Sequence, residues 1–155
     1  MKQHIELPNN PYDLFRVAVE DTKTALLAGA QLNTGDWYIN RKAAEPEFTD
    51  VCQVCLAGAI MLKHLPNKIL LNPEDFDNRT SVLLQTVDDI RRGIFLTRSS
   101  TFTNDFFQWK EYVKLSYQSY ITQDKRELGM FLQAMDKRVE FLKQFQHIKI
   151  LIKNE

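Results

Sequence analysis

Residues 50–65 form a mainly apolar segment, Asp50-Val51-Cys52-Gln53-Val54-Cys55-Leu56-Ala57-Gly58-Ala59-Ile60-Met61-Leu62-Lys63-His64-Leu65. If it is helical, it is apolar on nearly all sides, which is typical of a helix buried at the centre of a small domain. We therefore predict one central helix from Asp50 to Leu65, ended by Pro66. On such a helix the two sulfurs lie one turn apart and act as small apolar filler.

Four further helices are expected around this segment. The first runs from Pro11 to about Ala28, because Asn10 suits a helix cap, proline suits the first helical position, and Gly29 suits a left-handed end. A second is predicted from about Arg79 to Arg92, ended by Gly93, with its charged residues in water. These residues are Asp88, Asp89, Arg91 and Arg92.

The third and fourth of these helices follow a loop around Ser99. One is expected from Asp105 to about Tyr120 and the other from Gln123 towards Gln146. In the last helix, apolar residues repeat at alternating intervals of four and three, which predicts a seam in a helical bundle. The seam residues are Leu128, Leu132, Met135, Val139 and Leu142.

Two short segments favour strands. Residues 68–71 are apolar, too short for a helix and bounded by prolines, and residues 148–153 alternate with a period close to two. We expect them to pair as a two-stranded patch. The predicted fold class is therefore mainly α: a compact bundle of about five helices with this small β patch, forming one domain over residues 1–155.

Charge and composition exclude several classes of protein. Twenty basic residues balance twenty acidic ones in 155 residues, so the net charge offers no long-range attraction for nucleic acid. The start of the chain lacks a signal-peptide core, and its longest apolar run is too short to span a membrane. Two cysteines in an apolar stretch argue for a reducing compartment, so we expect a cytoplasmic protein.

The cysteine pair is the first candidate for chemistry. Cys52 and Cys55 have the spacing of half a zinc site, but a structural zinc needs about four ligands and no second pair exists. Core packing is the favoured interpretation, and redox or metal roles remain alternatives. A small-molecule pocket or an enzyme site would use Trp37, Arg41, Cys52, Cys55 and His64. No catalytic, metal-binding or cofactor-binding residue is predicted.

An aromatic and basic region between Arg98 and Tyr120 is the second candidate. Helical spacing would bury Phe106 and Trp109 in the core and leave other side chains for a protein partner. The candidate partner-binding residues are Arg98 and Phe102, before this helix, and Phe107, Lys110 and Lys114 on its outer face. Binding of single-stranded nucleic acid by the same aromatics and bases is a weaker alternative. The seam of the last helix also allows a second copy of the chain as partner.

One further pattern supports a partner-binding role. The order Gly35-x-Trp37, then Cys55-Leu56-Ala57-Gly58-Ala59, then Arg91-x-Gly93 resembles small uncharacterised proteins of phages and bacterial genomes, over about the first two-thirds of the chain. The resemblance implies a phage or prophage origin and an accessory role on a host protein. The leading hypothesis is a non-enzymatic interaction protein, and the alternative is a small-molecule binder or an enzyme.

Overall fold

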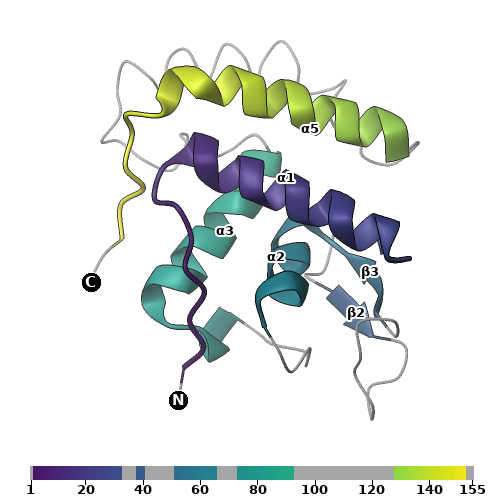
Figure 1. Cartoon of the computed structure of the whole chain (residues 1–155). Helices are drawn as coiled ribbons and strands as arrows, with labels where there is room; N and C mark the ends of the chain where they lie inside the picture. Colours follow the sequence, from purple (N-terminus) through teal and green to yellow (C-terminus); the bar gives the residue numbers. More distant parts are fainter. Residues whose placement is uncertain (1, 33–37, 41–50, 66–72, 93–127, 153–155) are drawn as a thin grey trace.

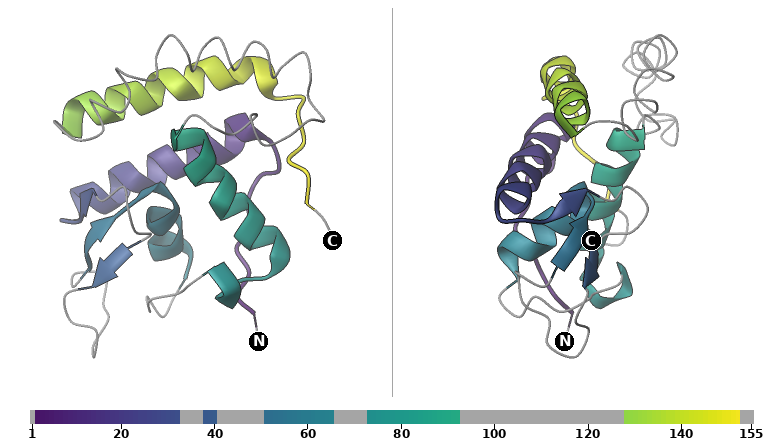
Figure 2. Two further views of the ribbon diagram at one scale, coloured as in Figure 1. Left: turned by 180° about the vertical axis from the view of Figure 1, so that it is seen from behind. Right: turned by 90° about the vertical axis from the view of Figure 1, so that its right-hand side faces the viewer.

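Helix α1 lies at the centre of the fold, between helix α5 and a layer that contains the other described elements (Figure 1). The computed structural model describes residues 2–32, 38–40, 51–65, 73–92 and 128–152. Two further views show the same order: α5 covers one side of α1, while α2, α3 and a small sheet lie on the other (Figure 2). The described residues are mainly helical and contain four α-helices. The helix expected from Asp105 lies outside them.

Helix α1, Pro11–Leu27, begins and ends as the sequence predicts. The Asn10 side chain accepts a hydrogen bond from the backbone N–H of Asp13 at 2.9 Å, and Pro11 opens the helix. Gly29 has a φ of 106°, which a residue without a Cβ adopts at low cost. The inward face of α1 packs on α2, α3 and α5, so α1 rather than the 50–65 segment is the hub of the core.

The predicted central helix is corrected by the structure. Residues Val51–Val54 form strand β3, and helix α2 covers only Leu56–His64. Strand β3 is the middle of a three-stranded sheet, parallel to β1 (Gln31–Leu32) and antiparallel to β2 (Tyr38–Asn40). A four-residue segment is too short for its periodicity to separate strand from helix, so pairing with β1 and β2 decides its conformation.

Helix α2 keeps the burial that was predicted for it. All residues from Leu56 to Leu62 are buried, and the helix lies against α1 and α3. Cys55 caps its start, with the sulfur accepting a hydrogen bond from the Gly58 N–H at 3.4 Å.

Helix α3, Asn78–Arg92, follows the short 3₁₀ helix η2, Pro73–Asp75. Asp77 caps it, because its carboxylate accepts from the Thr80 N–H at 2.8 Å. One surface assignment was wrong: Arg91 is buried, and its guanidinium binds the half-buried Asp88 at 3.3 Å. The pair forms because residues three apart are neighbours on one helix face.

Helix α5, Leu128–Leu142, continues into a 3₁₀ turn, η4, Lys143–Phe145. The residues that α5 buries differ in part from the predicted seam. Leu128 is exposed, Leu132 and Val139 are half-buried, and the core side is formed by Phe131, Met135, Arg138 and Leu142. Arg138 enters this line because its guanidinium donates to the Ile90 carbonyl at the end of α3, at 3.0 Å.

The predicted β patch is not borne out within residues 148–152, which the structure describes. Residues 148–152 form no strand, although Ile148 and Ile150 are buried. The backbone N–H of Ile150 instead donates to the Asn9 carbonyl at 3.1 Å, which joins the C-terminal tail to the N-terminal segment. Residues 68–71 lie outside the described residues. Among those that are described, no helix combines the length and hydropathy needed to cross a membrane.

Candidate functional site

The predicted pocket residues are only partly placed. Trp37 and Arg41 lie outside the described residues, and Cys52 lies in β3. Cys55 and His64 flank opposite ends of α2, which at 1.5 Å per residue separates their backbones by about 13 Å. The structure therefore does not bring the Cys55 thiol and the His64 imidazole together. The predicted partner residues Arg98, Phe102, Phe107, Lys110 and Lys114 also lie outside the described residues.

Cys55 has the environment of a core residue. Its side chain is 3% exposed, and burial raises the pKa of its thiol to about 11, which the amides of Gly58 and Ala57 only partly oppose. A nucleophilic cysteine is a thiolate near neutral pH. As placed here, Cys55 is a protonated thiol that caps a helix.

His64 is held by a buried carboxylate. Asp21 on α1 is 2% exposed, and its two oxygens bind the Lys63 ammonium at 3.0 Å and the His64 Nε2 at 3.2 Å. Both partners stand at the last turn of α2, so the three side chains join the two helices. The arrangement orients the His64 ring and leaves the side chain about one-third exposed, at 36%.

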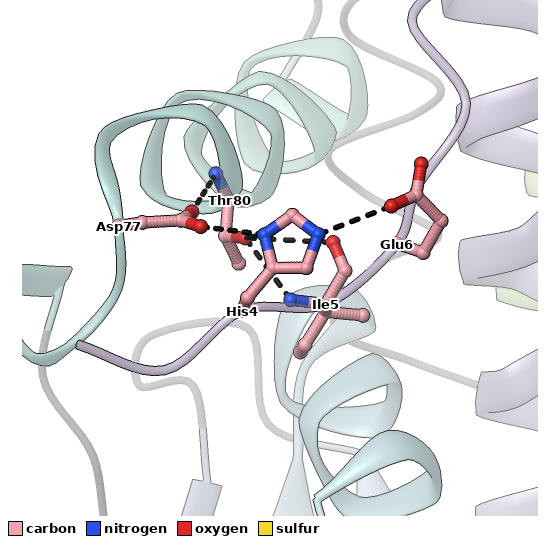
Figure 3. Close-up of polar contacts among 5 residues, drawn as sticks. All are labelled: His4, Ile5, Glu6, Asp77 and Thr80. Carbon is pink, nitrogen blue, oxygen red and sulfur yellow. Dashed lines mark hydrogen bonds and ion pairs between the residues drawn. The ribbon is translucent and has the colours of Figure 1, made fainter. Parts of the chain in front are cut away.

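A second histidine, His4, lies at the edge of the N-terminal segment, between two carboxylates (Figure 3). Its Nδ1 is 2.5 Å from Asp77 Oδ2, and its Nε2 is 3.1 Å from Glu6 Oε2. Ionised carboxylates are acceptors only, so both ring nitrogens must donate, and only the imidazolium can do that. The hydrogen bond that His4 donates to Glu6, and then the one it donates to Asp77, raise the pKa of His4 above its ordinary value.

Asp77 is the firmer of the two carboxylate partners. Its other oxygen caps α3, whereas the Glu6 side chain is 87% exposed. Partial burial raises the pKa of Asp77, but hydrogen bonds from Thr80 and His4 outweigh it, so the pKa lies below the ordinary value. The anion and the imidazolium thus stabilise each other.

Asp77, His4 and Thr80 have the residue types of a catalytic triad but not its geometry. The Thr80 hydroxyl is buried, accepts from the Ile5 N–H at 3.1 Å and approaches the same ring nitrogen that binds Asp77. In a triad the base uses its second nitrogen for the nucleophile. The described residues also contain no cluster of three or more His, Cys, Asp or Glu side chains suited to a metal ion.

Large apolar side chains are exposed where α1 ends and α5 begins. Leu27 is 91% exposed, Leu128 45% and Met130 40%. The two helices run antiparallel, so these ends lie at the same end of the pair (Figure 1). An ion pair between Lys23 and Asp136, at 3.0 Å, joins the helices about one turn inward from Leu27.

Sequence reasoning missed both polar clusters in different ways. Asp21 falls on the inward stripe of its helix, and a buried carboxylate requires a partner, so a signal for that cluster exists. His4 carries no such signal, because its partner Asp77 is 73 residues away.

Comparison of the chain with protein-family models, curated proteins and solved structures found no match in any of the three.

Proposed function

We propose that the protein is a non-enzymatic interaction protein that binds a protein partner through the exposed apolar end of α1 and α5. We call this surface the apolar end and define it as Leu27, Leu128 and Met130. The single observation that carries the proposal is the exposure of these three side chains at one end of a helix pair. A contiguous exposed apolar patch marks an interaction site, and we propose that these three side chains contribute to one contact surface with the partner.

The surroundings of the apolar end fit a protein interface. Polar and charged side chains, including Lys23, Thr24, Gln133 and Asp136, follow on the same two helices. An apolar centre with a polar rim is the usual arrangement of a protein–protein contact. A partner that presents aliphatic or aromatic side chains would bury Leu27 without breaking any hydrogen bond of the fold.

Two further observations support a binding role over catalysis. The best nucleophile candidates with described side chains, Cys55 and Thr80, are sealed in the core. The resemblance of the sequence pattern to small uncharacterised phage and bacterial proteins, for its part, implies an accessory role on a host protein. A second copy of the chain is the other candidate partner.

The test compares capture of partners by three forms of the full chain. The wild type is expected to retain a specific protein from a bacterial lysate, or to dimerise by light scattering, and Leu27→Ser with Met130→Ser should abolish that contact. Leu151→Ser is the matched control, because Leu151 is 59% exposed but lies in the C-terminal tail. The proposal is wrong if the double variant binds as the wild type does, or if the wild type shows neither association.

A second candidate function, small-molecule binding or catalysis at His64, is supported by the orientation of that ring. Asp21 holds Nε2, and a carboxylate–histidine pair is a common way to position an imidazole for proton transfer. Fragment screening by NMR would show ligands that shift the His64 ring signals in the wild type and not in His64→Gln. Shifts that map only to the apolar end would reject this alternative.

A further inference from the structure

The N-terminal segment, residues 2–10, is fastened to the fold at two separate places. At its beginning, the Gln3 N–H donates to the Asp75 carbonyl at 2.8 Å, and the Asp77 N–H donates to the Gln3 carbonyl at 2.9 Å. The Ile5 N–H then donates to the Thr80 hydroxyl at 3.1 Å. These contacts lay the first residues against the start of α3.

The far end of the same segment is anchored independently. The Asn9 carbonyl accepts from Ile150, and Asn10 caps α1. Between the two anchors, Ile5 and Leu7 are each 3% exposed and close one side of the core. The segment can therefore loosen at its beginning while α1 and the C-terminal tail stay in place.

At the beginning of the segment, the contact with α3 includes a charged side chain, that of His4. His4 pairs with Asp77 of α3 and with Glu6 of its own segment (Figure 3). A neutral imidazole donates through one nitrogen, so loss of the proton leaves a lone pair facing a carboxylate. Only the imidazolium can donate to both carboxylates at once, so loss of the proton removes at least one of the two charge-assisted hydrogen bonds.

We propose that residues 2–7 form a strap that is fastened to α3 while His4 is protonated and that loosens when His4 loses its proton. Loosening uncovers the part of the core that Ile5 closes and frees the backbone groups of Asp75 and Asp77. The strap is a conformational device separate from the apolar end, and it does not depend on the proposed function.

The charges around His4 set the direction of the pH dependence. The hydrogen bond to Glu6 and then that to Asp77 raise the pKa of His4, so the strap is fastened below the ordinary histidine value of about 6.5 and loosens as the pH rises through the raised value. The other ionic side chains of the strap, of η2 and of the first turn of α3 are Lys2, Glu74, Asp75 and Arg79.

Hydrogen exchange of single amides, measured by NMR on the full chain and corrected for intrinsic rates, tests the proposal. Between pH 6 and pH 9 the protection of the Gln3 and Ile5 amides is expected to fall several-fold, with the midpoint at the titration of the His4 ring. The Ala59 amide, which bonds to Cys55 within the core, should not change.

Two variants complete the test. His4→Gln should show weak strap protection that is independent of pH, and His147→Gln, at another exposed histidine, should behave as the wild type. The proposal is overturned if wild-type protection is flat across this range, or if His4→Gln keeps the wild-type pH dependence. If His4→Gln fails to fold, the wild-type comparison of amide and ring midpoints decides alone.

Discussion

His4 and His64 both join segments that are far apart in the sequence, but they do so in opposite surroundings. His64 shares with Lys63 a carboxylate that is 2% exposed, between two packed helices. His4 is 47% exposed and stands between two partly or fully exposed carboxylates at the edge of an extended segment. A buried charge therefore makes its partners necessary to the fold, whereas exposed charges can exchange a proton without unfolding it.

The largest effect is expected when Asp21 loses both partners. Lys63→Met combined with His64→Gln leaves a buried carboxylate uncompensated, which should lower the free energy of unfolding by about 2 kcal/mol. Urea denaturation at pH 7 measures it. Lys23→Met, which breaks the exposed pair with Asp136, is the control and should change stability by less than about 0.5 kcal/mol.

Adding Asp21→Leu to that double variant separates the cost of the unpaired charge from the cost of lost packing. Removal of the carboxylate should recover much of the lost stability, because the cost lies in the unpaired charge. A triple variant no more stable than the double one would show that the loss came from packing of the Lys63 and His64 stems instead.

Two variants of Asp77 distinguish its role as the cap of α3 from its role as the ion-pair partner of His4. Asp77→Ala removes the cap of α3 and should cost about 1 kcal/mol, whereas Asp77→Asn keeps a capping oxygen and should cost only a few tenths. Thermal denaturation at pH 6 compares them. Equal losses in the two variants would mean that the charge facing His4, and not the cap, carries the effect.

The stability difference between wild type and His4→Gln should be small and bell-shaped in pH. The pKa of His4 is raised, so its contribution is complete below about pH 6.5 and is lost as the pH rises through the folded value. The pKa of Asp77 is lowered, so its share is present above about pH 4 and is lost as the pH falls through its folded value. Denaturation at pH 3, 6 and 9 checks both limbs, and a constant difference would contradict them.

The smallest effect is expected from Glu6→Gln. The Glu6 side chain is 87% exposed, so global stability should hardly change. The pKa of His4 should nevertheless fall, because the hydrogen bond to Glu6 is the leading cause that raises it. NMR titration of the ring measures this, and an unchanged midpoint would assign the effect to Asp77 alone.

The parts of the fold that the sequence predicts well are those with local causes. The ends of α1 and α3 fall within one residue of expectation, because Asn10, Pro11 and Gly29 act on their own backbone neighbours. Leu56 to Leu62 are buried because the run is apolar on all sides, and exposing such a surface to water is unfavourable.

The errors have the opposite origin. Residues Val51–Val54 form a strand that pairs with β1 and β2, and residues 148–152 form no strand but bond to the N-terminal segment through the Ile150 N–H and the Asn9 carbonyl. The buried line of α5 includes Arg138 because a carbonyl at the end of α3 accepts its guanidinium. In each case the deciding partner is remote in the chain.

Sequence alone was enough to place the ends of α1 and α3 and the buried run Leu56 to Leu62 of α2, since caps and continuous apolar surface act over a few residues. The sheet, and the charged contacts of His4 and of His64, could be seen in the tertiary structure alone. Asp21 and His64 are 43 residues apart, and His4 and Asp77 are 73 apart. Hydrogen bonds over such separations leave no periodic trace in a sequence, because nothing near either residue constrains the identity of its partner.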